Sequence, residues 1–211
     1  MRTKKSYFWC GVEDKLNIFM NPENIKVLTI HGFNGMPNKG WHPWLMIELR
    51  KQKIYCASLV MKNPSTPKAS EWVNEIDYNI KKFPKDKIIL VGHSLGVPAI
   101  LKYLEKANSK NILGCVLVSG PYKDDRKGKV AQILKSFFVN GFKFENIKKK
   151  AKHFTVIHGT DDSVVHFSHA EFLSKTLEGK LIAIKNGGHL NSSAGWYKLP
   201  YALKAILEII K

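Results

Sequence analysis

The chain has 211 residues, of which 44% are hydrophobic and 24% are charged. These proportions are ordinary for a globular protein and exclude a disordered chain, and the length favours one well-buried domain over two. No apolar run approaches the ~18 residues of a membrane-spanning helix. The basic start Met1–Lys5 is not followed by the apolar core of a signal peptide. We therefore expect a single domain over residues 1–211, without a membrane span, in the cytoplasm.

The charge of the chain is strongly unbalanced, with 34 Lys and Arg against 17 Asp and Glu and a net charge of +17. Such a charge attracts nucleic acids and other anionic surfaces. Only three of the basic residues are arginines, whose guanidinium suits bidentate phosphate and base contacts better than an ammonium does. The densest run, residues 148–150, ends a helix-like segment, where positive charge complements the helix dipole. We favour a solvated lysine-rich surface, with an anionic partner as the alternative.

Three cysteines, Cys10, Cys56 and Cys115, lack the spacing of a metal site. Cys56 and Cys115 lie in apolar runs, so we expect both to be buried thiols in a reducing compartment.

Strand-like and helix-like segments alternate along the chain. Short apolar runs predict six strands, at residues 27–30, 54–59, 88–91, 112–118, 154–157 and 181–184. Amphipathic segments predict helices at residues 41–51, 69–83, 98–107, 130–139, 168–177 and 198–210. This alternation is typical of an α/β fold with a mostly parallel sheet of six or seven strands, covered by helices on both faces. Residues 6–20, within a possible extension over residues 1–24, are expected to add one or two edge strands, and no insertion is long enough for a large lid domain.

The third apolar run ends in Gly92-His93-Ser94-Leu95-Gly96, which fits the G-x-S-x-G pattern. In that pattern the serine sits on a sharp turn between a strand and a helix, where a base can reach its hydroxyl. The pentapeptide alone arises readily by chance. The strand before it and the helix after it make Ser94 a candidate nucleophile.

A nucleophilic serine needs a base, and the base needs a group that orients it. Asp162 follows the fifth apolar run and His189 follows the sixth. In a parallel sheet these loops open at the same edge as the Ser94 turn. The order Ser94, Asp162, His189 is that of an α/β-hydrolase triad.

These residues carry a family resemblance. The chain resembles the α/β-hydrolases and, among them, the small serine hydrolases of the RBBP9/YdeN type. The matching segments are residues 31–35, 40–45, 92–96, 159–162 and 188–189. The resemblance spans roughly residues 25–211 and implies a compact hydrolase with little or no lid and no metal or organic cofactor.

Two adjacent aspartates compete for the orienting role. The resemblance favours Asp162, which stands three residues after Gly159 and three before Val165, and leaves Asp161 to cap the loop. The family usually has proline where this chain has His166, which alters the loop rather than the triad.

The oxyanion hole requires two backbone N–H groups aimed at the developing negative charge. Leu95, directly after the nucleophile, supplies one, and Phe33 in the loop after the first strand supplies the other. Phe33 and Trp41 are candidates for the substrate pocket, with core packing as the alternative for either ring.

The other histidines have simpler interpretations. We expect His93 to pack rather than to act as the base, and His31 to support the oxyanion loop through a hydrogen bond. His158, His166 and His169 cluster in sequence, but no carboxylate or cysteine pattern accompanies them, so no metal site is predicted.

The sequence therefore predicts a carboxylesterase-like serine hydrolase that cleaves an ester or related acyl bond of a small molecule through an acyl-enzyme. A thioesterase, acyltransferase or peptidase with the same triad, or a weakly active fold serving as a protein- or anion-binding module, is the alternative. The oligomeric state and the acyl preference do not follow from the sequence.

Overall fold

The computed structural model describes residues 24–108 and 111–211, which form one six-stranded parallel sheet flanked by helices. The strands are β1 (Ile25–Ile30), β2 (Tyr55–Ser58), β3 (Lys87–His93), β4 (Ile112–Val118), β5 (His153–Gly159) and β6 (Lys180–Ile184). The helices are α1 (His42–Lys51), α2 (Ala69–Lys81), α3 (Gly96–Lys106), α4 (Lys129–Phe138), α5 (Phe144–Ile147), α6 (Ser168–Thr176) and α7 (Pro200–Ile210). All six predicted strands are present. The edge strands expected within residues 6–20 lie outside the described residues.

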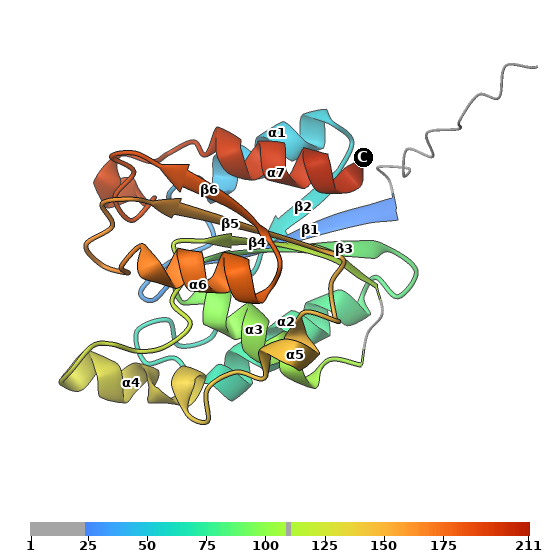
Figure 1. Ribbon diagram of the computed structural model, residues 1–211. Coiled ribbons are helices and arrows are strands. Elements are labelled where there is room, and N and C mark those ends of the chain that lie inside the picture. The colour runs from blue at the N-terminus through green and yellow to red at the C-terminus, as the bar shows by residue number, and fades with distance from the viewer. Residues whose placement is uncertain (1–23, 109–110) are drawn as a thin grey trace, which may run out of the picture.

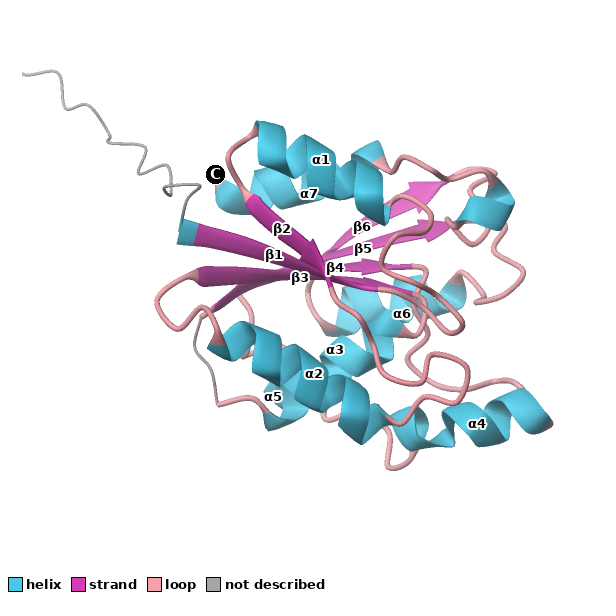
Figure 2. Ribbon diagram, turned by 180° about the vertical axis from the view of Figure 1, so that it is seen from behind, coloured by secondary structure: helices cyan, strands magenta, loops and turns pink. Residues whose placement is uncertain are grey.

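The sheet is the middle of three layers. Helices α1 and α7 cover one face, and α2 to α6 cover the other (Figures 1 and 2). Strand β4 shows why both faces must be covered, because all seven of its residues are buried. Its alternate side chains enter the two hydrophobic clusters, Cys115 and Leu117 on one side and Val116 and Val118 on the other. This explains the continuous apolar runs in the sequence, which are typical of strands buried on both faces.

The strand order is β2-β1-β3-β4-β5-β6, and every pairing is parallel. The chain runs outward from β1 to β2, returns to the other side of β1 for β3, and then continues in that direction. The order therefore reverses between β1 and β3. In open α/β sheets this switch point opens a crevice at the carboxyl ends of the strands, where ligands bind. The loop that follows β1 and the turn that follows β3 border this crevice.

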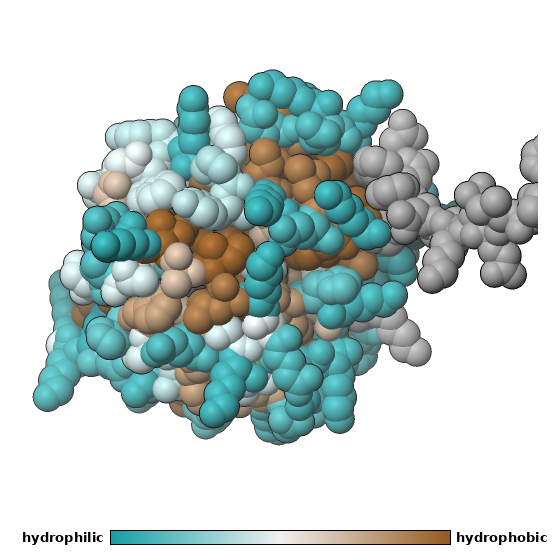
Figure 3. All heavy atoms as spheres, turned by 45° about the horizontal axis from the view of Figure 1, so that its top comes forward, coloured by the Kyte–Doolittle hydropathy of each residue, from teal (hydrophilic) through white to brown (hydrophobic). Residues whose placement is uncertain are grey.

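On the face shown in Figure 3, hydrophilic side chains surround exposed apolar areas. Cys56 and Cys115 are buried free thiols, as predicted. Burial raises the pKa of the Cys56 thiol to about 12, which makes it a poor nucleophile. Within the described ranges, each helix is too short or too polar to cross a membrane.

Candidate active site

Ser94 occupies a sharp turn between β3 and α3. Its φ of 51° lies in the left-handed region, which is uncommon for a residue with a side chain. Backbone hydrogen bonds hold the turn, because Ser94 N–H donates to Val118 O (2.9 Å) and Val97 N–H donates to Ser94 O (3.0 Å). Gly96 is required here, since a Cβ at that position would collide with the carbonyl oxygen of Ile30. The flanking structure thus keeps the Ser94 side chain in a strained, outward-pointing position.

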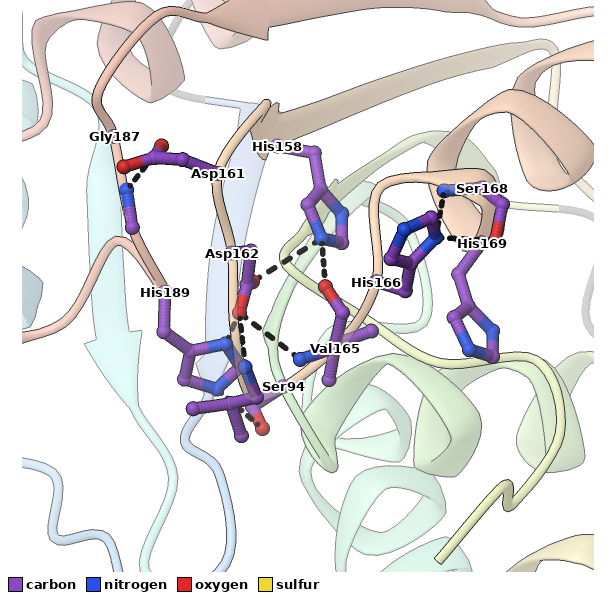
Figure 4. Close-up of polar contacts among 12 residues, drawn as sticks. Ser94, His158, Asp161, Asp162, Val165, His166, Ser168, His169, Gly187 and His189 are labelled. Atoms are coloured by element: carbon purple, nitrogen blue, oxygen red, sulfur yellow. Dashed lines mark hydrogen bonds and ion pairs between the residues drawn. The ribbon is translucent and has the colours of Figure 1, made fainter.

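Three side chains from distant parts of the chain meet at this turn (Figure 4). The Oγ of Ser94 lies 3.0 Å from Nε2 of His189, and Nδ1 of His189 lies 2.8 Å from Oδ2 of Asp162. Asp162 follows β5 and His189 follows β6, at the carboxyl edge of the sheet where the sequence predicted them. The arrangement forms a continuous hydrogen-bonded chain from a hydroxyl to a buried carboxylate, which is the geometry of an activated nucleophile.

The carboxylate of Asp162 is enclosed and fully hydrogen-bonded. Its Oδ1 accepts the backbone N–H groups of Val164 (2.8 Å) and Val165 (2.9 Å). Burial alone would raise the pKa of Asp162, but hydrogen bonds from His158, His189 and the Val165 N–H outweigh it and hold the pKa well below its usual range. Asp162 therefore carries a negative charge next to His189 at neutral pH.

The neighbouring Asp161 points elsewhere. Its Oδ1 accepts the backbone N–H of Gly188 at 3.0 Å, so it fastens the loop that carries His189. The structure brings Asp162, and not Asp161, to the imidazole.

Three side chains, two from other segments and one from the same connection, hold the backbone of the His189 loop. His93 contacts the carbonyl oxygen of His189 through Nε2 (3.0 Å), Trp41 donates Nε1–H to Leu190 O (2.9 Å), and Trp196 donates Nε1–H to Gly187 O (2.8 Å). The loop's position is thus set by hydrogen bonds that the sequence analysis missed. Nothing in a single sequence marks a contact such as Trp41 to Leu190, which joins residues 149 positions apart.

Two buried histidines near the loop are neutral. Burial, reinforced by neighbouring histidines, lowers the pKa of both His93 and His42 to about 3. His93 is therefore unsuited to be a general base at neutral pH, as the sequence analysis expected. His42 stacks on Trp41 and shares a hydrogen bond of 2.9 Å with Thr29 Oγ1 through Nδ1.

The loop after β1 and the turn after β3 each present a free backbone N–H group beside the serine. In the described part of the chain, no acceptor takes the N–H of Phe33 or that of Leu95, whereas the N–H of Asn34 donates to Pro64 O (2.9 Å). His31 supports the turn, with Nδ1 lying 2.8 Å from Gly32 O. Gly32 allows the close approach, because a Cβ there would lie 2.9 Å from the Ser94 Cβ. Both candidate donors thus lie in segments that border Ser94.

A cavity of about 300 Å³ opens over Ser94 and His189. Polar side chains such as Asn34, Lys39 and Asn191 contribute much of its lining. Phe33 and Trp41 line it too, but Trp41 is only 1% exposed and belongs mainly to the core under α1. The described residues contain no cluster of three or more His, Cys, Asp or Glu side chains placed to hold a metal ion.

The parallel sheet between two layers of helices, with a serine on a turn at its switch point, defines this protein as an α/β-hydrolase-fold protein. The family model described as serine hydrolase matches residues 27–208. The chain therefore belongs to the serine hydrolase family.

Individual relatives agree with this assignment. The protein YdeN of Bacillus subtilis (strain 168) is 32% identical over 176 residues, which cover 83% of this chain and 90% of YdeN. The crystal structure of the B. subtilis ydeN gene product has a TM-score of 0.80 at 30% identity and covers 87% of this chain and 97% of that one. The serine hydrolase RBBP9 of Rattus norvegicus is 23% identical over 188 residues, 89% of this chain and 97% of RBBP9. Est1E from Butyrivibrio proteoclasticus shares the fold, with a TM-score of 0.69 at 18% identity over 90% of each chain.

Proposed function

We propose that the protein cleaves an ester bond of a small substrate through a Ser94–His189–Asp162 triad and an acyl-enzyme intermediate. The observation that carries this proposal is the hydrogen-bonded chain of 3.0 Å and 2.8 Å from the serine to the carboxylate, with the serine facing a cavity. A fold that only bound a partner would have no physical need for a strained serine paired with an imidazole and a buried aspartate.

In this mechanism Ser94 Oγ attacks the carbonyl carbon of the ester while His189 Nε2 takes the hydroxyl proton. Asp162 holds the proton of His189 on Nδ1 and balances the positive charge that develops on the ring. The oxyanion forms beside the unpaired N–H groups of Phe33 and Leu95, which stabilise it. His189 then returns the proton to the leaving alcohol, and a water molecule activated by the same histidine releases the acid.

The cavity favours a small substrate. A volume of about 300 Å³ is at the lower limit of common ligand pockets, and the lining includes several polar side chains. The described residues also include no large lid domain that would enclose a long acyl chain. We therefore expect short acyl groups to be hydrolysed faster than long ones.

The test combines active-site labelling with turnover. The protein is expected to react with a fluorophosphonate probe and to hydrolyse short p-nitrophenyl esters, with activity falling as the acyl chain lengthens. Ser94→Ala should abolish labelling and lower kcat by about 1,000-fold or more. Ser65→Ala, which alters an exposed loop serine, is the matched control and should behave like the wild type. Intact protein that neither labels nor hydrolyses any ester would contradict the proposal, and preferred turnover of thioesters or amides in the same screen would reassign the reaction.

A further inference from the structure

His158 is a histidine that the mechanism above does not use. It lies in β5, four residues before Asp162, and its side chain is completely buried. In Figure 4 its ring points toward the Asp162 carboxylate from a different element than His189 does. A buried imidazole next to an active-site carboxylate needs an explanation, because burying a polar ring is unfavourable unless its nitrogens are hydrogen-bonded.

The contacts of His158 define where its proton resides. Its Nε2 lies 2.8 Å from the carbonyl oxygen of Val165 and 3.1 Å from Oδ2 of Asp162. Both of these oxygens only accept hydrogen bonds, so Nε2 must carry the proton. Its Nδ1 is buried and has no partner among the described residues. A proton on Nδ1 would find no acceptor among the described residues, whereas one on Nε2 finds Val165 O.

Asp162 consequently receives hydrogen-bond donors on both oxygens. Oδ1 accepts two backbone N–H groups, and Oδ2 lies between the Nδ1 of His189 and the Nε2 of His158. The last torsion of an aspartate side chain is broad, so bonds to one oxygen alone leave the other free to swing. The close contact of His158 Nε2 with Oδ2, at 3.1 Å, narrows that freedom on the oxygen that orients the base.

We propose that His158 is a positioning residue that holds Asp162 Oδ2 against His189. This inference rests on the proposed function, because it assigns His158 a role in the same triad. His158 acts only through Asp162 and does not touch the substrate. Its hydrogen bond to Val165 O fastens the far end of the loop, and the same Nε2 lies 3.1 Å from Asp162 Oδ2, so one ring contacts both the loop and the carboxylate that the loop presents.

Two amide substitutions distinguish the polar contact of His158 with Asp162 from mere packing of its ring in the core. The amide nitrogen of glutamine can lie where Nε2 of histidine lies, whereas that of asparagine lies near the Nδ1 position. His158→Gln therefore keeps a donor toward Asp162, His158→Asn moves it away, and His158→Leu removes it. His153→Leu is the matched control, since His153 is an exposed histidine of the same strand.

The kinetic test measures hydrolysis of a short p-nitrophenyl ester. His158→Leu and His158→Asn are expected to lower kcat by about 10- to 100-fold with KM nearly unchanged, the loss typical of one hydrogen bond to a charged group. His158→Gln should stay within about 5-fold of the wild type, and His153→Leu should match it. If His158→Leu does not fold, the comparison of the glutamine and asparagine variants still decides. Equal activity of those two variants, or full activity of a folded His158→Leu, would overturn the proposal.

A spectroscopic test needs no substrate. The proton between His189 and Asp162 should give a low-field NMR resonance. In His158→Leu, Asp162 Oδ2 is no longer held against His189, so this resonance should move upfield or broaden, whereas it should remain in place in His158→Gln. An unchanged resonance in His158→Leu would refute the positioning role. If instead the resonances behave as expected but Ser94→Ala leaves hydrolysis intact, the proposed function fails while the contact between His158 and Asp162 stands.

Discussion

His93 Nε2 lies 3.0 Å from the main-chain carbonyl oxygen of His189, so the residue before the proposed nucleophile holds the loop of the proposed base. The two residues are 96 positions apart, and their rings lie 5.1 Å from one another. Because Nε2 faces a carbonyl oxygen, it must carry the ring proton of the neutral imidazole. This contact couples the serine turn after β3 directly to the histidine loop after β6.

We expect activity to depend on the hydrogen-bond donor of His93 more than on the shape of its ring. His93→Leu should lower kcat by about 10-fold or more because the His189 loop loses an anchor. His93→Gln can place an amide nitrogen near the Nε2 position and should recover most of the activity. Ester hydrolysis together with urea unfolding checks this, with the exposed His166→Gln as control. A stably folded His93→Leu with wild-type kcat would show that the other anchors suffice.

The two adjacent aspartates should differ sharply in their effects. Asp162→Ala removes the carboxylate that contacts His189 and should reduce kcat by about 1,000-fold or more. Asp161→Ala removes only the bond to the Gly188 N–H and should cost about 10-fold or less. Steady-state kinetics on the same ester measures both. The reverse ranking would transfer the orienting role to Asp161.

Gly32→Ala tests how closely the oxyanion loop approaches the serine. The new Cβ would lie 2.9 Å from Ser94 Cβ and 3.4 Å from Ser94 Oγ, so the loop or the serine must shift. We expect a fall in kcat of about 100-fold, comparable to the loss of one oxyanion donor. Asn38→Ala, an exposed change in the same loop outside the cavity lining, is the control for general loop perturbation. A Gly32→Ala variant with unchanged kcat would argue against Phe33 N–H as a donor.

The buried histidines predict a fall in stability on mild acidification. The unfolded chain binds a proton at His42 and at His93 near the ordinary value of 6.5, whereas both folded pKa values are about 3. The unfolded state therefore binds more protons as the pH falls from 6.5 toward 3, and the free energy of unfolding decreases by about 1.4 kcal/mol per pH unit for each histidine. Asp162, whose pKa is also lowered, loses its contribution only below about pH 4.

Urea unfolding between about pH 6 and pH 5 measures this slope, and His42→Asn isolates one histidine. The asparagine amide can take the place of Nδ1 beside Thr29 Oγ1 but does not titrate. The free energy of unfolding of His42→Asn should therefore change less steeply with pH than that of the wild type. The difference should be the contribution of one histidine, about 1.4 kcal/mol per pH unit. Identical slopes for the two proteins would mean that His42 titrates normally in the native state.

Much of the fold could be predicted because its signals are local. Continuous apolar runs such as that of β4 identify strands buried on both faces, and the helices between them require a parallel sheet. Parallel strands place all their carboxyl ends at one edge, so the loops that hold Ser94, Asp162 and His189 could be assigned to one site without coordinates. The family resemblance then favoured Asp162 over Asp161, and the geometry agrees with that preference.

The sequence by itself determined the layered architecture, the edge of the sheet that carries the chemistry and the candidate reactive residues, because periodicity and chain order encode them. Only the tertiary structure decided which groups hold those residues in place. His158 looked like one of three clustered histidines and proved to contact Asp162, and Trp41, a candidate for either the pocket or the core, proved to anchor Leu190. The physical reason is that a hydrogen bond depends on separations of about 3 Å between atoms that the chain brings together only on folding.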